Sequence, residues 1–185
     1  MSTATRWLSD DEQRTWRSFL NACQSIFAAV DAQLLRDSGL PHGYYEILVH
    51  LSEAPDRALR MSQLARASTF SKSRLSHAVA RLEERGWVQR QDCPTDRRGQ
   101  IAMLTDAGFD MLAAAAPGHV EQVRRVLLDP LTPDQVRQLG EISAAISAAA
   151  RSGMEVSCSE ADLTDLTGLA GLADSGCAGE ADDEG

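Results

Sequence analysis

Basic side chains are concentrated between residues 57 and 98, and their positive charge could bind an anionic partner. This segment holds ten basic residues against four acidic ones, a local net charge of +6, although the formal net charge of the whole chain is −9. The basic residues are Arg57, Arg60, Arg66, Lys72, Arg74, Arg81, Arg85, Arg90, Arg97 and Arg98. Such a cluster attracts a polyanion and is the usual electrostatic footprint of nucleic-acid binding. The sequence therefore predicts a phosphate-binding surface in this segment.

Two of these arginines lie in the stretch DCPTDRRGQ, residues 92–100, between two runs typical of strands, WVQRQ and QIAMLT. Residues 92–99, DCPTDRRG, are polar and contain a proline and a glycine, so they predict the loop of a two-stranded β-hairpin. Arg97 and Arg98 at the tip suit DNA, because arginine contacts phosphates or enters a narrow minor groove. Phosphate repels Asp96, so we expect this residue to orient Arg98 or to accept hydrogen bonds from loop amides.

A helix-turn-helix pattern precedes the hairpin. Ser62 is predicted to cap a short helix, QLARAS, and Ser71 to cap a second one, KSRLSHAVARLEER, which ends at Gly86. Apolar residues of the second helix recur at i, i+3, i+4 and i+7, which predicts one buried face and leaves the other face and the first turns polar. A polar, basic helix of this kind suits the major groove of DNA. The candidate DNA-contacting residues are Ser62, Ser71, Lys72, Ser73, Arg74, Ser76, His77, Arg81, Arg97 and Arg98.

Two helices are predicted upstream of this unit. Ser9 and Glu12 form a capping-box pattern that starts a long helix over residues 9–37. Its apolar positions keep a 3.6-residue spacing, and they are Trp16, Phe19, Leu20, Cys23, Phe27, Val30 and Leu34. The stretch HGYYEILVHLSEA predicts the second helix, which ends before Pro55.

Two further helices are predicted downstream of the hairpin. The first covers residues 105–128, and we expect a bend or an interruption at residues 117–118, Pro-Gly, because proline disrupts a helix interior. The last covers residues 133–151, with Thr132 as its cap and Gln135 as the capping-box partner. The fold class predicted from these patterns is mainly α, with a two-stranded β wing.

The C-terminal residues 154–185 differ in composition from the rest of the chain. They contain nine acids and no lysine or arginine, so the remaining 18 acids balance the 18 bases of residues 1–153. The segment is rich in Gly, Ala and Ser and has no aromatic residue. Such a segment cannot build a core, so it is predicted to be an acidic disordered tail.

The segment from residue 61 to residue 108 resembles the winged helix-turn-helix of the MarR family of bacterial transcriptional regulators. The motifs that carry the resemblance are RLEERGWV, the Asp-x-Arg pair of Asp96 and Arg98, and LTDAG. The resemblance implies a regulator over residues 8–153, with its winged helix-turn-helix at about 41–104 and dimerisation helices at about 9–37, 105–128 and 133–151. It also implies a homodimer on a palindromic operator and a small-molecule or redox input. His77, Ala80 and Gly99 depart from the residues common in the family, so its base preference does not carry over.

Cysteine and histidine patterns leave a redox role and a metal site as alternatives. Cys23 occupies a region where peroxide-sensing members of the family carry a reactive cysteine, but its place on the apolar stripe favours a buried structural thiol. Cys93 is expected to be more exposed, within the hairpin loop. His42, His50 and Glu46 could suggest a metal site, but isolated histidines are more often polar packing residues, so no metal site is predicted.

Four aromatic residues have two open interpretations: they line a cleft for an aromatic ligand, or they pack in the core. They are Trp16, Phe19, Tyr44 and Tyr45. The chain contains no nucleophile elbow, P-loop or HExxH motif, so neither an enzyme nor a cofactor is predicted. With no apolar run long enough for a membrane span and no signal-peptide pattern, the expected location is the cytoplasm. The interpretation chosen is a ligand-responsive repressor, and the alternatives are a thiol-based regulator and a winged-helix protein-interaction module without DNA binding.

Overall fold

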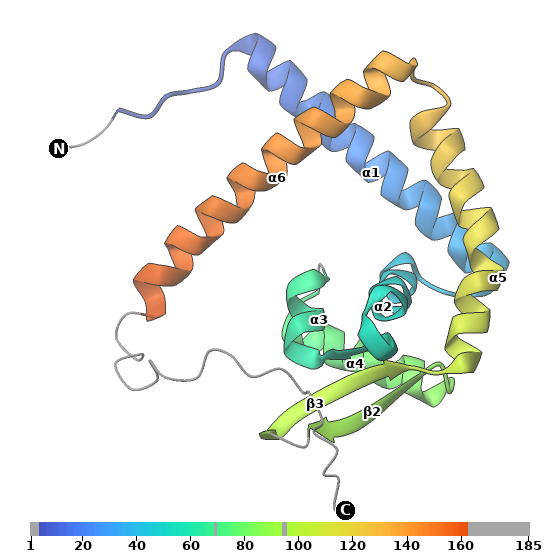
Figure 1. Cartoon of the computed structure of the whole chain (residues 1–185). Helices are drawn as coiled ribbons and strands as arrows, with labels where there is room; N and C mark the ends of the chain where they lie inside the picture. The colour runs from blue at the N-terminus through green and yellow to red at the C-terminus, as the bar shows by residue number, and fades with distance from the viewer. Residues whose placement is uncertain (1–3, 69, 94–95, 163–185) are drawn as a thin grey trace, which may run out of the picture. The chain divides into compact units, whose positions relative to one another are not determined.

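The structure is a computed structural model, and Figure 1 shows the arrangement of its elements. It describes residues 4–68, 70–93 and 96–162, except for the side chains of residues 96–98, 151 and 153–162. The chain divides into two compact units that join at Leu131 and Thr132, and each unit is described separately. Among the helices of the described residues, none is long and apolar enough to cross a membrane.

Helix α1 spans Asp10–Ser38 and begins at the predicted capping box. The main-chain N–H of Ser9 donates to Glu12 Oε2 at 2.8 Å, and the N–H of Glu12 donates to Ser9 Oγ at 3.3 Å. Gly39 ends the helix in the left-handed region, with φ of 60°, where a side chain would be strained. Helix α2 follows at His42–Glu53, and its first amide donates to the carboxylate of Asp31 at 2.8 Å. This bond fixes the start of α2 against α1.

A three-stranded antiparallel sheet replaces the two-stranded hairpin that the sequence predicts. After a short 3₁₀ turn at Pro55–Arg57, β1 covers Ala58–Arg60 and pairs with β3, Asp96–Leu104, on the side opposite β2, Val88–Cys93. The β2–β3 hairpin is confirmed. Strand β1 was missed because its three residues find their partners more than forty positions along the chain, at residues 101–103.

The helix-turn-helix consists of α3, Met61–Ala67, and α4, Lys72–Glu84. Ser71 caps α4 as predicted, because its side chain accepts a hydrogen bond from the N–H of Arg74. The predicted cap of α3 is wrong: the helix begins one residue before Ser62, and the N–H of Arg60 donates to Gln63 Oε1 at 3.0 Å. Strand β1 leads directly into α3, so the helix starts earlier than the serine indicated.

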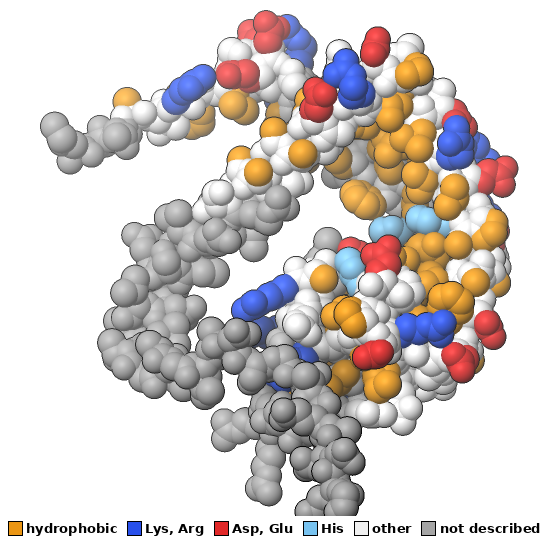
Figure 2. All heavy atoms as spheres, in the orientation of Figure 1, with side chains coloured by type: hydrophobic (Ala, Val, Ile, Leu, Met, Phe, Trp, Pro, Cys, Tyr) orange, Lys and Arg blue, Asp and Glu red, His pale blue; other side chains and the backbone are white. Residues whose placement is uncertain are grey.

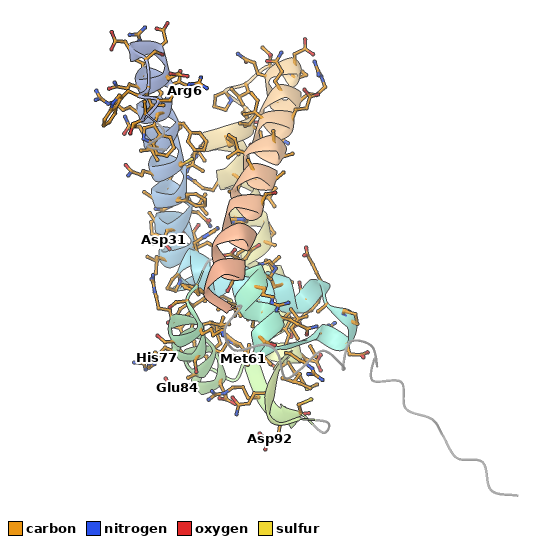
Figure 3. All side chains as sticks on the ribbon, turned by 90° about the vertical axis from the view of Figure 1, so that its left-hand side faces the viewer. Arg6, Asp31, Met61, His77, Glu84 and Asp92 are labelled. Atoms are coloured by element: carbon orange, nitrogen blue, oxygen red, sulfur yellow. The ribbon has the colours of Figure 1, made fainter. Side chains whose placement is uncertain are left out.

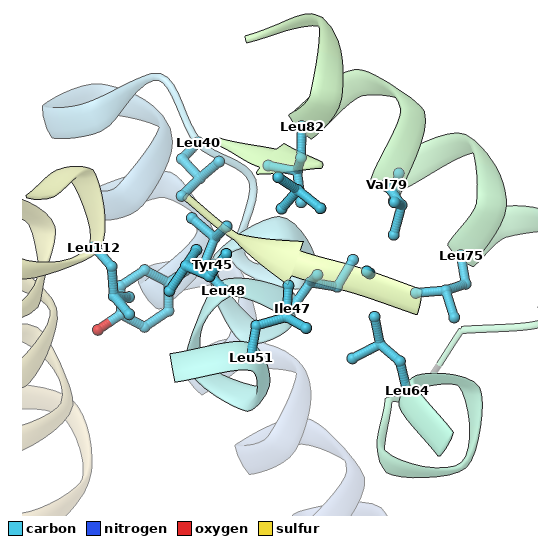
Figure 4. Close-up of a cluster of buried hydrophobic side chains, with 14 of the residues drawn as sticks. Leu40, Tyr45, Ile47, Leu48, Leu51, Leu64, Leu75, Val79, Leu82 and Leu112 are labelled. Atoms are coloured by element: carbon cyan, nitrogen blue, oxygen red, sulfur yellow. The ribbon is translucent and has the colours of Figure 1, made fainter. Parts of the chain in front are cut away.

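A single hydrophobic core joins these elements. Leucines from α2, α3 and α4 meet in one cluster (Figure 4). Val88 of β2 and Leu104 of β3 belong to the same cluster. Ten large side chains are almost completely buried: Leu34, Leu40, Ile47, Leu48, Leu51, Leu64, Leu75, Leu82, Val79 and Val88. The core fixes α4 on its inner side, so the outer side of α4 is held in place for contact with a partner.

Helix α5, Asp106–Val123, is tied to the sheet and α4 through Thr105. The Thr105 hydroxyl donates to the Gly86 carbonyl at 2.7 Å and accepts from the Gly108 N–H at 3.0 Å, and its own N–H donates to the Trp87 carbonyl at 3.1 Å. The interruption predicted at residues 117–118 is wrong, because α5 continues through Pro117. The irregular part is instead a π-helical segment at Arg124–Leu128.

The second unit contains α6, Pro133–Asp162. Its start agrees with the predicted capping box, since the Thr132 N–H donates to Gln135 Oε1 at 2.9 Å and the Gln135 N–H donates to Thr132 Oγ1 at 3.3 Å. The helix continues past its predicted end at residue 151 and past the predicted start of the tail at residue 154. No proline interrupts this stretch, and Gly153 is its only glycine, so the helix can continue. The rest of the predicted tail, residues 163–185, lies outside the described residues.

Candidate nucleic-acid interface

Helix α4 has the two faces that the sequence predicts. Leu75, Ala78, Val79 and Leu82 are at most 2% exposed, and they attach the helix to the core. The candidate residues on α4 are all exposed: Lys72, Ser73, Arg74, Ser76, His77 and Arg81. Figure 3 shows His77 and Glu84 projecting from the outer side of the helix. The helix therefore presents a continuous polar surface that includes its N-terminal turn.

The first turn of α4 combines free amides with basic side chains. Ser71 satisfies the N–H of Arg74, whereas the amides of Lys72 and Ser73 begin the helix at its positive end, where helices bind phosphate. The guanidinium of Arg74 lies over the ring of Phe70, with 5.4 Å between the Arg74 carbon Cζ and the ring centroid. Farther along, Arg81 forms an exposed ion pair of 2.9 Å with Glu84, which water screens and which a DNA phosphate can replace.

Residues from three elements surround a hollow beside this turn. The hollow has a volume of about 350 Å³, and Ser62 of α3, Lys72 and Ser76 of α4 and Gln100 of β3 contribute to its lining. Three of these four residues were predicted from the sequence to contact DNA. Gln100 was missed, although its position beside Gly99 at the start of the predicted strand placed it close to the hairpin arginines. The structure thus brings the helix-turn-helix and the wing to one surface.

An ion pair that the sequence analysis missed joins α4 to the wing. The Glu83 carboxylate accepts hydrogen bonds from the Arg90 main-chain N–H at 3.1 Å and from Arg90 Nε at 2.8 Å, and Arg90 Nη2 lies 2.7 Å from Glu83 Oε2. These bonds lower the pKa of Glu83, because they stabilise its charged form. The pair fixes β2 relative to α4. The sequence does place opposite charges on either side of the Gly86 turn, Glu83 before it and Arg90 after it, and this pattern could have indicated the ion pair.

The wing differs from prediction in the length of its loop. The predicted loop covered residues 92–99, whereas the strands end and begin at Cys93 and Asp96. Asp96, Arg97 and Arg98 therefore belong to β3 rather than to a loop, and the positions of their side chains lie outside the described part of the structure. Their roles on DNA stay predictions.

Cys93 was expected to be exposed, and the structure shows it buried, with 4% of its surface accessible. The strand register shifts between Asp92 and Cys93, so a β-bulge turns the cysteine toward the face that carries Val88. The other cysteine of interest, Cys23, is half-buried on α1. Within the described residues, no group of three or more His, Cys, Asp and Glu side chains is arranged for a metal ion.

An open cavity of about 590 Å³ lies where α1, α2 and the start of α4 meet. We call it the aromatic cavity, and its lining residues are Phe27, Asp31, Pro41, His42, Gly43, Tyr44, Glu46, Phe70 and Arg74. Gly43 is required here, because a Cβ at this position would lie 2.4 Å from the Phe70 ring. Close contact with α2 therefore holds Phe70 in the wall of the cavity.

The four aromatic residues considered as one ligand cleft do not come together. Tyr44 lines the aromatic cavity, whereas Tyr45 is 6% exposed and belongs to the core. Trp16 and Phe19 stack on each other on the exposed face of α1, with ring centroids 6.3 Å apart. Tyr44 and Tyr45 point to different sides of α2, and Trp16 lies about four turns of α1 before Asp31, so a ligand role for the four aromatic residues stays a prediction.

Two histidines join the aromatic cavity to α5. The ring centroid of His119 lies 4.5 Å from that of Tyr45 and 6.0 Å from that of His42, which lines the cavity. Burial lowers the pKa of His119, and the neighbouring His42 adds to this effect, so the neutral form of the ring is favoured. On the face drawn in Figure 2, histidine side chains, in pale blue, lie beside hydrophobic side chains at the surface. The cavity therefore borders the contact between α2 and α5.

Comparison with solved structures gives clear similarities over most of the chain. Sco3205 from Streptomyces coelicolor, a MarR family transcriptional regulator solved in complex with DNA, is 51% identical with a TM-score of 0.75, and the match covers 78% of this chain and 91% of that one. AbsC, a MarR family transcriptional regulator from the same organism, is 40% identical with a TM-score of 0.74, covering 80% of this chain and 99% of that one.

Sequence comparisons agree with the structural ones. A family model described as the MarR family matches residues 38–99. The transcriptional repressor MprA from Escherichia coli (strain K12) is 26% identical over 133 residues, which are 62% of this chain and 74% of that protein. These relatives are transcriptional regulators rather than enzymes.

Proposed function

Because the chain belongs to the MarR family of transcriptional regulators, we propose that it is a repressor that binds a palindromic operator as a homodimer and responds to a small-molecule effector. The observation that carries the proposal is the exposed, basic N-terminal half of α4, which lies beside the wing on one surface. A DNA-bound relative that is 51% identical supports the DNA-binding part. The relative MprA is named a transcriptional repressor, which supports repression rather than activation of transcription. A regulator of this kind acts on DNA in the cytoplasm.

On DNA, α4 enters the major groove with its N-terminal turn first. Ser71, Lys72 and Ser73 contact phosphates, since the turn offers amides and positive charge. Arg74, Ser76 and His77 reach base edges from the exposed face. The remaining proposed contacts are those of Ser62, Arg81, Arg97 and Arg98, with Asp96 as the residue that orients Arg98. These roles give the α4 contacts sequence specificity and the wing contacts electrostatic affinity.

Apolar surface on the terminal helices supports the homodimer. On α1, Trp16, Phe19 and Phe27 are 52%, 42% and 59% exposed, and on α6, Ile142 and Ile146 are 56% and 46% exposed. Large apolar side chains exposed in series are rare on a monomer and mark an interface. A second copy that covers them doubles the DNA-reading surface, as a palindrome requires.

The effector is proposed to bind in the aromatic cavity. Its volume of about 590 Å³ is in the range of small-molecule sites, and Arg74 contributes both to its wall and to the exposed face of α4. A ligand in the cavity therefore affects a residue that is proposed to read DNA.

Selection of duplexes from a random pool tests the DNA-binding proposal. We expect an inverted repeat whose half-sites are centred about one helical turn apart, or a multiple of it. His77→Ala should relax the preference at one position in each half-site, since a base contact contributes about 1–3 kcal/mol of discrimination. Glu53→Gln, an exposed change on α2, is the matched control and should select the wild-type sequence.

Failure to enrich any sequence, together with the absence of salt-dependent retention on heparin or nonspecific duplex, would instead favour a protein-interaction module. A thiol-based regulator is less well supported, since Cys93 is buried and Cys23 is half-buried. Treatment with hydrogen peroxide should leave operator affinity unchanged.

A further inference from the structure

The lining of the aromatic cavity indicates which charge its ligand carries. Three carbon rings, those of Phe27, Tyr44 and Phe70, contribute to the walls. The face of an aromatic ring carries negative electrostatic potential and attracts a cation. The structure contains an example at this site, because the guanidinium of Arg74 lies over the Phe70 ring at 5.4 Å. The cavity thus already accommodates positive charge against an aromatic wall.

Carboxylates add to this preference. Asp31 and Glu46 line the cavity from α1 and α2, against a single permanent cation, Arg74. One oxygen of Asp31 accepts the His42 N–H at 2.8 Å, and Glu46 lies 3.8 Å from the imidazole of His50. Among the described residues, neither carboxylate lies within 4.0 Å of the Arg74 guanidinium, so neither forms an ion pair with it. The permanent charges of the lining therefore leave an excess of negative charge.

We infer that the aromatic cavity binds an organic cation, an ammonium group attached to an apolar body. The inference rests on the proposed function, because it specifies the effector of that same regulator. The ammonium group lies between the carboxylates of Asp31 and Glu46, and the apolar body lies against the rings. An aromatic acid of the same size meets two carboxylates and is disfavoured.

Arg74 competes with such a ligand. Its side chain is exposed and has no hydrogen bond or ion pair among the described residues, so it can leave the ring of Phe70 by rotating about its side-chain bonds. Two cations do not share one ring face, so the bound ligand excludes the cavity position of Arg74. Because Arg74 is also proposed to contact DNA, the ligand and the operator act on the same side chain.

Calorimetric titration with benzyltrimethylammonium tests the inference, with benzoate and benzyl alcohol at the same ionic strength as the anionic and neutral probes. We expect the cation to bind more tightly than either. Asp31→Asn and Glu46→Gln should each weaken the cation about threefold, the effect of one partly screened charge. The asparagine in Asp31→Asn retains an oxygen that accepts the His42 N–H, and thermal melting checks that both variants are folded.

Arg74→Ala should tighten the cation about threefold, since it removes the competing internal charge. The matched controls lie outside the cavity: Glu53→Gln is an exposed change on α2, and Arg66→Ala is an exposed change on α3. Both should leave the affinity unchanged. An anion site predicts the opposite sign for all three cavity variants.

The inference is overturned if benzoate binds more tightly than the cation, if the cation does not bind, or if Asp31→Asn and Glu46→Gln leave cation binding unchanged. An operator titration of the ligand-free protein is done in parallel. If the ligand-free protein does not bind DNA specifically, the proposed function is refuted, whatever the cation titration gives. Failure of the proposed function is therefore distinguishable from failure of the cation inference.

Discussion

Replacing Glu83 by glutamine tests how the wing is held against α4. The Glu83 carboxylate accepts two hydrogen bonds from Arg90, at 3.1 and 2.8 Å, and lies 2.7 Å from a third nitrogen of the same residue. A glutamine side chain can accept some of these hydrogen bonds from Arg90, but it carries no negative charge. The side chains of Glu83 and Arg90 are 35% and 28% exposed, so water weakens their attraction. We expect Glu83→Gln to lower the free energy of unfolding by about 1 kcal/mol.

A double-mutant cycle with Arg90→Gln isolates the contribution of the pair. Urea unfolding of the four proteins should give a coupling energy of about 1 kcal/mol. Glu84→Gln is the control, because the neighbouring Arg81–Glu84 pair is 68% and 62% exposed, so water screens it and its contribution should be smaller. Operator affinity should fall in Glu83→Gln, since the wing is no longer fixed. A coupling energy near zero would refute the assignment of this pair as the connection between wing and helix.

The same residue sets a pH dependence. Because Arg90 lowers the pKa of Glu83, the folded protein releases this proton at a lower pH than the unfolded chain does. The stabilisation is therefore complete above the ordinary glutamate pKa of about 4.5 and is lost as the pH falls through the folded value. The difference in free energy of unfolding between wild type and Glu83→Gln should shrink from about pH 6 to about pH 3. A difference that stays constant over this range contradicts the reasoning.

Arg98→Ala should weaken operator and nonspecific DNA alike, with the log–log salt slope reduced by about 1 per subunit, and an unchanged slope would count against a wing contact. Light scattering at micromolar concentration should give about twice the 20.0 kDa chain mass, and a monomer would exclude the palindromic mode. Gly108→Ala places a Cβ 2.1 Å from the Trp87 carbonyl oxygen and should cost about 1–3 kcal/mol in urea unfolding, whereas Gly140→Ala, with open space around it, should not destabilise. Deleting residues 163–185 removes six acids and no bases, so it should tighten nonspecific DNA binding at low salt without lowering the melting temperature.

The parts of the fold that could be predicted from the sequence depend on short-range interactions. The caps at Ser9, Ser71 and Thr132 each use a partner three residues along the chain, so the pattern is visible in a few letters. The buried and exposed faces of α4 follow from helical spacing alone, and all six candidate residues of α4 lie on its exposed side.

The parts that could not be predicted depend on distant partners. Strand β1 exists because Ala58 meets Met103, and no local pattern marks its three residues. Burial of Cys93 follows from a bulge that only the paired strands define. Trp16 and Tyr44 are both aromatic residues of amphipathic helices, and only tertiary packing separates an exposed surface from a cavity wall.

The three hydrogen bonds at Thr105 make this residue a pivot. They join the end of α4, the end of the wing and the beginning of α5 at a single point. The 18 residues of α5 form an arm of about 27 Å, so a tilt of about 10° at the pivot displaces the far end by about 5 Å. Conversely, a displacement of several ångströms at the far end of the arm would correspond to only a small change of angle at Thr105. The three bonds therefore couple the orientation of α5 to that of α4 and the wing.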